Sequence, residues 1–245
     1  MIVSLRPLLF LQALAMAALS LWAASDPWFE IMLQHLQGLF VAPAATIQET
    51  MAWVGLGRLL SLLLLVTVAG GGAAVWVMAL CRRAGHDRSL VSLRSLVALT
   101  GVMALWCSLF LNHSAIAWQG KRVRLALQRD RFDSIARPLR NDWPTRDGSL
   151  QHLGPYMAYP FGKPRTLILL TSPSVTGTQL CISAIERCDS GALKLQLAGP
   201  DGGDWAEWHP PSSQPGSFTG GLNEHHDLQA SLELGGGWYL VRYRG

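Results

Sequence analysis

Charged residues are scarce in this chain, and they are scarcest in its first half. Only 15% of the 245 residues are Asp, Glu, Lys or Arg, against about 25% in ordinary soluble domains. The cores of three long apolar stretches, 7–24, 59–81 and 95–117, hold no ionisable side chain. Ion pathways, proton relays and transporter sites usually place an ionisable residue at membrane depth. This shortage therefore argues against transport through the first half of the chain.

Short catalytic motifs are missing as well. The sequence has no Gly-x-Ser-x-Gly elbow, no Walker loop, no Gly-x-Gly-x-x-Gly after a strand and no His-Glu-x-x-His. No nucleic-acid motif accompanies the basic residues, and stacking aromatics are not interleaved with them. We therefore expect no nucleic-acid partner, and the sequence favours interaction over catalysis.

The four cysteines give no redox motif. Cys81 and Cys107 lie in or beside the apolar stretches, and neither Cys181 nor Cys188 belongs to a Cys-x-x-Cys. On one extended strand, Cys181 and Cys188 would lie more than about 20 Å apart, beyond the roughly 7 Å limit for a disulfide. A bridge between them would need a bend in the chain.

The first half contains three apolar stretches, each long enough to cross a bilayer. About 20 apolar residues in a helix cover roughly 30 Å of hydrocarbon. We expect 7–24, 59–81 and 95–117 to be transmembrane helices, so that residues 1–120 form an all-α membrane anchor. Their small residues, Ala69 to Ala74 above all, suit close helix packing within the chain or, alternatively, self-association.

Two segments of the anchor allow a second interpretation. The first stretch resembles a signal peptide in having small residues before Asp26, although its 18 apolar residues exceed the usual core of such peptides. The weakly apolar segment 31–47 is expected to be an interfacial helix, with a fourth span as the alternative.

Arginine placement predicts the orientation. The loop 82–94 carries four Arg, whereas 25–57 carries no Lys or Arg. Under the positive-inside rule the loop 82–94 is cytoplasmic, which places the C-terminal half outside the cytoplasm of the plasma membrane. Five basic residues after the third stretch, between Lys121 and Arg131, would favour the opposite side.

Residues 121–245 have the charge density of a globular domain, with fourteen basic and twelve acidic residues. From Gly154 onward, short apolar or alternating runs separated by turn residues predict an antiparallel β-meander. The strands are expected at 166–171, 179–185, 193–197, 228–234 and 238–243. Alternation in 193–197 and 228–234 predicts one buried and one wet face. The fold class is thus a membrane anchor plus an α+β domain.

Helical spacing continues beyond the third stretch. Leu125, Phe132, Ile135 and Leu139 recur at helical intervals, and no proline occurs between Ser95 and Pro138. We therefore expect one continuous helix from Ser95 to about Arg137, with a break at Gly120 as the alternative. Its part from 120 to 139 would cover the buried face of the sheet.

One polar cluster suits a metal. Its members fall in two segments that flank a Gly/Pro/Ser-rich loop: Glu207, His209, Glu224, His225 and His226. Imidazole and carboxylate ligands of this kind suit zinc, but His225 and His226 would point to opposite faces of a strand. Solvated loop residues are the simpler interpretation. We expect no cofactor, with a zinc-like metal as the alternative.

Trp205 and Trp208 are candidates for an aromatic interaction surface. The simpler interpretation is that they pack beneath the loop 199–222. Together, these observations predict a multi-pass membrane protein that presents a small α+β domain outside the membrane to a partner or ligand. A membrane-tethered, metal-dependent hydrolase that uses the His/Glu cluster is the alternative.

Overall fold

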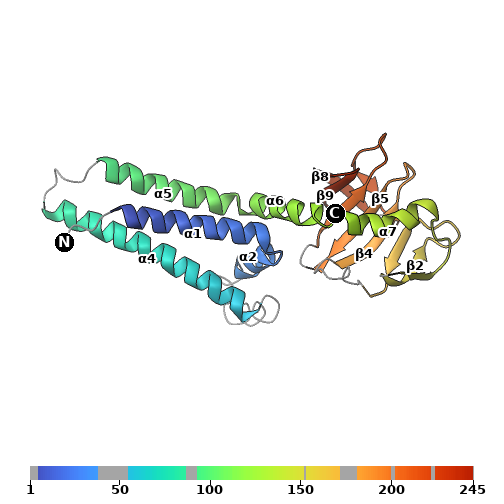
Figure 1. The fold of residues 1–245 in the computed structure, drawn as a ribbon, viewed down its shortest axis with the longest axis horizontal. Coiled ribbons are helices and arrows are strands. Elements are labelled where there is room, and N and C mark those ends of the chain that lie inside the picture. Colours follow the sequence, from blue (N-terminus) through green and yellow to red (C-terminus); the bar gives the residue numbers. More distant parts are fainter. Residues whose placement is uncertain are drawn as a thin grey trace. The chain divides into compact units, whose positions relative to one another are not determined.

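The computed structural model describes residues 5–37, 55–86, 93–151, 153–171, 181–199, 202–221 and 224–244. The chain folds as two compact units, Met1–Gly120 and Lys121–Gly245. Figure 1 shows helices in the first unit and an antiparallel sheet in the second.

Long apolar helices make up the first unit. They are α1 (Leu5–Ser25), the short α2 (Phe29–Gln37), α4 (Leu56–His86) and α5 (Leu93–Leu111), followed by α6 (His113–Ala126), which runs past the unit's end. Pro7–Ser25 and Leu56–Met78 are long and apolar enough to cross a membrane, and α5 with α6 makes a third candidate if the bent pair is one span. These helices indicate a membrane protein. Of the segment 31–47 that was expected to be an interfacial helix, residues 31–37 belong to α2, and the rest lies outside the described residues.

The expected continuous helix from Ser95 to Arg137 is wrong. The chain bends by 59° between α5 and α6. At this bend Asn112 Nδ2 donates to Ser108 O at 2.8 Å, and His113 Nδ1 lies 2.6 Å from Phe110 O. Such side chains compete with the backbone for helix carbonyls. A second break follows at Leu127 and Gln128, before α7 (Arg129–Asn141).

Gly120, the alternative break, lies inside α6. A Cβ at this position would overlap the backbone of Ala24 at the end of α1. Glycine is therefore needed there for close helix approach, and the local conformation stays helical.

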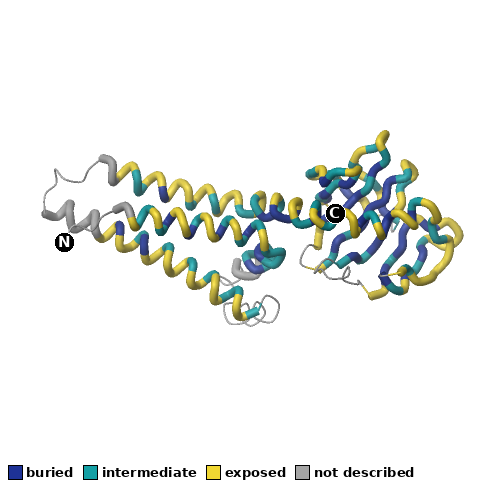
Figure 2. Tube along the Cα trace, in the orientation of Figure 1, coloured by how far each residue is buried: buried dark blue, intermediate teal, exposed yellow. Residues whose placement is uncertain are grey.

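A buried glutamine joins the three long helices. Gln12 of α1 is fully buried, its Nε2 donates to Ala69 O of α4 at 2.9 Å, and its Oε1 accepts from Trp106 Nε1 of α5 at 2.8 Å. The outward-facing positions are apolar, as the exposed Phe10, Leu64 and Leu105 illustrate, and Figure 2 shows exposed residues along these helices. The unit thus keeps this polar contact inside and apolar surface outside, as lipid requires.

Among its described residues, the second unit contains α7 and nine strands. They are β1 (Gly148–Leu150), β2 (Gly154–Tyr159), β3 (Thr166–Leu169), β4 (Cys181–Arg187), β5 (Leu193–Ala198), β6 (Asp204–Trp208), β7 (Phe218–Thr219), β8 (His225–Gly235) and β9 (Trp238–Arg244). The order is β1-β2-β3-β4-β5-β6-β9-β8-β7, and every pair is antiparallel. The predicted antiparallel sheet is confirmed, but only its first six strands follow one another as a meander.

Helix α7 covers one face of this sheet, as Figure 1 shows. Its buried residues are Phe132, Ile135, Ala136 and Leu139. Phe132 packs on Trp238 of β9 with ring centroids 5.3 Å apart, and Trp238 Nε1 donates to Asp133 at 3.1 Å. The amphipathic spacing seen in the sequence therefore serves this contact, although the covering helix begins nine residues later than expected, at Arg129, and runs past Pro138.

The Gln12 contact predicts a packing defect. Gln12→Leu removes both interhelical hydrogen bonds, each worth about 0.6 kcal/mol on average in membrane proteins. We expect the full chain in micelles to lose about 1 kcal/mol of stability, measured by titration with a denaturing detergent. Leu14→Ala, on the exposed side of the same helix, is the control and should change little. Equal stability of Gln12→Leu and the parent chain would contradict the assignment.

Candidate functional site

A row of polar residues crosses the face of the sheet that α7 leaves uncovered. Directly paired residues of neighbouring strands lie on the same face. The register pairs Thr166 with Glu186, Glu186 with Lys194, Lys194 with Glu207, and Glu207 with Tyr239. Because successive residues alternate between faces, Tyr239 lies opposite to its neighbour Trp238, which packs on α7. The row therefore occupies the face away from the helix.

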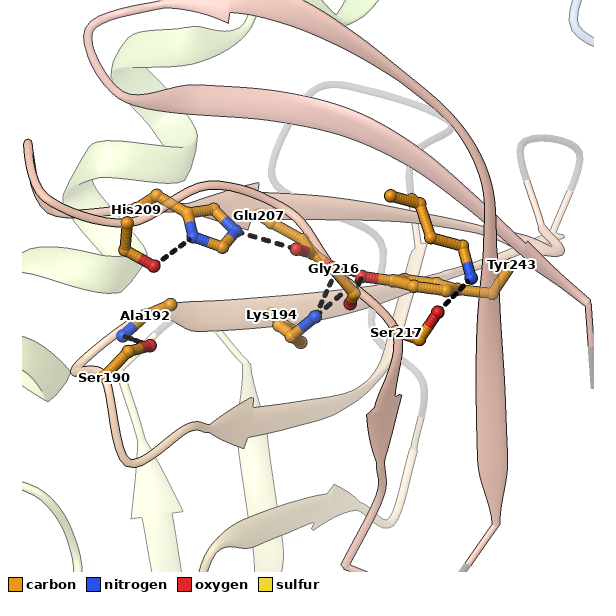
Figure 3. A network of polar contacts seen from close by, with 10 residues as sticks. Ser190, Ala192, Lys194, Glu207, His209, Gly216, Ser217 and Tyr243 are labelled. Carbon is orange, nitrogen blue, oxygen red and sulfur yellow. Dashed lines mark hydrogen bonds and ion pairs between the residues drawn. The ribbon is translucent and has the colours of Figure 1, made fainter.

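A buried ion pair stands at the centre of this row (Figure 3). Lys194 is 2% exposed and Glu207 is fully buried. Lys194 Nζ donates to Glu207 Oε1 at 3.0 Å and to Tyr243 OH at 2.7 Å, and Tyr243 OH donates to the same carboxylate oxygen at 2.7 Å. Burial, and then the Glu207 charge, raise the pKa of Tyr243 well above its usual range. The hydroxyl therefore stays protonated and available as a donor.

His209 attaches a loop to this ion pair. Its Nε2 lies 2.8 Å from Glu207 Oε2, and its Nδ1 lies 3.0 Å from Ser213 Oγ. The order serine, histidine, carboxylate is that of a hydrolase triad. Here, however, the carboxylate already balances Lys194 and accepts from Tyr243, so its charge is not reserved for the imidazole. We interpret the hydrogen bonds from Ser213 through His209 to Glu207 as contacts that hold segment 209–221 against the sheet.

Phe218 completes the cover. Lys194 Nζ lies 3.7 Å from the centroid of its ring, a cation–π distance. The same ring stacks on His226 at 4.8 Å and meets Tyr243 edge-on at 5.0 Å. The polar row is thus closed off from solvent over β5 and β6 by a segment that the sequence alone suggested was an ordinary loop.

Beside the covered row, over β3 and β4, the face stays open as a cleft of about 240 Å³. Its polar lining residues are Thr166, Ser183, Glu186, Gln196, Glu224 and His226. Its apolar lining residues are Ile168, Leu169, Ala184 and Trp205. A concave site with an apolar wall and convergent polar groups is the usual form of a binding pocket.

Two polar groups that line the cleft, Glu186 and Thr166, are buried, and this burial costs free energy. Glu186 accepts from Gly221 N at 3.3 Å, and burial raises the pKa of its carboxyl. Thr166 is 2% exposed, and its Oγ1 has no hydrogen-bond partner among the described residues. Gly221 lies against Thr166 so closely that a Cβ would overlap the threonine side chain. A buried hydroxyl without a partner calls for an explanation.

The predicted metal cluster divides into separate pairs. Glu207 and His209 belong to the buried network, whereas Glu224 and His226 line the cleft, 3.9 Å apart. His225 is exposed and lies 3.1 Å from Asp227. Within the part of the chain that the structure describes, no three His, Cys, Asp or Glu side chains are grouped to hold a metal. Cys181 and Cys188 are not joined by a disulfide.

The two tryptophans do not form one exposed surface. Trp205 is 4% exposed and packs against Phe218, His226 and Tyr243. Trp208 lies on the opposite face, where the Arg140 guanidinium covers its ring at 4.2 Å. An odd spacing of three residues within a strand places side chains on opposite faces, which the single-surface hypothesis overlooked.

Sequence reasoning missed Thr166, Glu186, Lys194 and Tyr243. Lys194 stands in the alternating run Leu193 to Leu197, whose polar positions were assigned to a wet face, yet it is buried beneath the 209–221 segment. The available signal was the Gly/Pro/Ser-rich loop itself, since it is long enough to fold back over that face.

Comparison with known proteins gives no match: no family model, no curated protein and no solved structure is similar to this chain.

The Lys194–Glu207 pair predicts a large loss of stability. Glu207→Gln leaves the buried ammonium without its counter-charge, and breaking such a pair costs about 3–5 kcal/mol. Chemical denaturation of the full chain, followed by tryptophan fluorescence, should show it. Glu233→Gln is the matched control, because Glu233 pairs with Tyr239 in the same row but is exposed. A loss no larger than that of the control would show that the ion pair is dispensable.

Proposed function

We propose that this is a multi-pass membrane protein that presents its C-terminal domain outside the cytoplasm, as a binding module for a small ligand or a single side chain of a partner. The observation that carries the proposal is the cleft beside the polar row, with the unpartnered Thr166 hydroxyl in its wall. The role is sensory or structural, and the plasma membrane is its proposed location.

The features of the helices support a role as an anchor, with binding left to the C-terminal domain. Its candidate spans are apolar, and the buried polar side chain that they share, Gln12, is used for interhelical hydrogen bonds. The lipid bilayer is thus the first proposed partner of the helices. Gly70, Gly71 and Gly101 have open space where a Cβ would stand, so they are available for self-association, which we include in the proposal.

The size of the cleft supports binding of something small. Pockets for drug-sized ligands enclose about 300–1,000 Å³, whereas this one encloses about 240 Å³. The polar groups come from β3, β4, β5, β8 and the β7–β8 turn, so they are held by the sheet rather than by one loop. This rigidity favours recognition.

The division of the His/Glu cluster into separate pairs favours binding over the metal-dependent hydrolase. A catalytic zinc needs three protein ligands, and Glu224 with His226 supplies two. We therefore retain the binding function alone.

Orientation is testable by reporter fusion. The arginine-rich loop 82–94 against the arginine-free 25–57 predicts that alkaline phosphatase fused after Gly245 is active outside the cytoplasm. A reporter that works only in the cytoplasm, fused at the same point, should be silent, and the two should exchange activity when fused after His86. Cytoplasmic activity after Gly245 would overturn the orientation.

The cleft predicts a co-purifying ligand. Native mass spectrometry of the full chain, taken gently from its own membranes, should show a small-molecule adduct. Ala184→Leu fills the cleft and should abolish the adduct, because the added side chain occupies the ligand's volume. Ser231→Leu, an exposed position of the same sheet, should retain it. An adduct that survives Ala184→Leu would place binding elsewhere.

A further inference from the structure

The charge of the cleft identifies a class of ligand. Two carboxylates, Glu186 and Glu224, face it, and its lining among the described residues includes neither Lys nor Arg. The buried cation of the neighbouring row, Lys194, already pairs with Glu207 and Tyr243. A carboxylate taken out of water needs an opposite charge or a proton. A cation bound in the cleft would balance Glu186, which is buried, and would also lie near Glu224, which is mostly exposed and 3.9 Å from His226.

The Thr166 hydroxyl is an independent indication of a bound group. It is buried in the wall of the cleft and unpartnered among the described residues, although folding normally satisfies such atoms. A hydroxyl oxygen accepts hydrogen bonds from a donor such as an ammonium. Glu186 and Glu224 are acceptors that line the cavity, and the Thr166 hydroxyl lies beside it, packed against Gly221.

The remaining wall is apolar. Ile168, Ala184 and Trp205 line the cleft beside its polar groups. The cleft encloses about 240 Å³, less than the roughly 300–1,000 Å³ of drug-sized pockets. This space suits a short aliphatic chain that ends in a polar head.

These features favour an ammonium over other cations. An ammonium has three donors around a compact charge, whereas a guanidinium presents a planar fork that matches one carboxylate. Within the described part of the chain no three side chains are grouped to hold a metal ion. Resting on the proposed binding function, we propose that the cleft takes a primary ammonium on a short aliphatic stem, from a free alkylamine or from a lysine side chain of a partner protein.

Calorimetry on the full chain in neutral phosphatidylcholine nanodiscs tests the ligand class. Three probes share one stem: n-pentylamine, 1-pentanol and pentanoate. The amine should bind with one site per chain, the alcohol about tenfold or more weakly because charge-assisted hydrogen bonds are lost, and pentanoate not at all. If the alcohol binds as tightly as the amine, the cleft is a binding site but the ammonium assignment is wrong. If no probe binds, the assignment is overturned, and the native adduct alone then decides the binding function.

Two variants locate the interaction. Glu186→Gln should weaken pentylamine binding about tenfold or more, while Glu233→Gln, on the exposed part of the same sheet, should leave it unchanged. Thr166→Val removes the hydroxyl at nearly constant shape, so the domain should fold at least as well and still bind the amine more weakly. Unaltered binding in both Glu186→Gln and Thr166→Val would overturn the proposal.

A peptide pair distinguishes the two sources of the ammonium. A blocked peptide with one lysine is compared with the same peptide acetylated on that lysine. Binding of the lysine peptide tenfold or more tighter than pentylamine, and lost on acetylation, identifies a partner's side chain. Equal or weaker binding of the peptide identifies a free alkylamine. Binding that survives acetylation would contradict ammonium recognition.

Discussion

The buried pair of Lys194 and Glu207 is the interaction on which the second unit depends. A charge removed from water this completely is tolerated only if every partner is in place. Glu207 meets this demand with three donors from three places in the sequence, Lys194, Tyr243 and His209. These three contacts with Glu207 therefore fix the strand register, the position of β9 and the placement of segment 209–221 over the sheet. The cleft lies on the part of the same face that this segment leaves open.

The parts of the fold that could be predicted from the sequence are those that depend on neighbouring residues in the chain. Hydropathy identified the candidate spans, and period-2 runs between turn residues identified an antiparallel sheet, because both signals lie within a few neighbouring residues. β6 was missed because Asp204 to Ala206 are buried on both faces and do not alternate. The continuous helix failed because the chain bends at Asn112 and His113, whose side chains bond to Ser108 O and Phe110 O, and because it breaks again at Leu127 and Gln128. Such interruptions leave no mark in the spacing of apolar residues along the sequence.

The candidate site was only partly predictable, for a different reason. Glu207, His209, Glu224 and His226 were conspicuous because they are close in sequence, but closeness suggested one metal cluster where the structure forms two pairs. Thr166 and Glu186 became neighbours through register, twenty positions apart. Nothing in either local sequence marks the other as a partner. Sites built across a sheet depend on pairing, and pairing is the least local property of the chain.

The strand order has a consequence for the time course of synthesis. β6 pairs with β9, which lies about thirty residues further along the chain. As the chain is made, one side of β6 remains an open edge until β9 appears, and open edges invite pairing with other chains. The intervening residues include β7, β8 and the segment over Lys194 and Glu207. Insertion of β9 therefore closes the edge and brings Tyr243 to the buried charges in one step. The hydrogen-bonded network around Lys194 and Glu207 is therefore completed last.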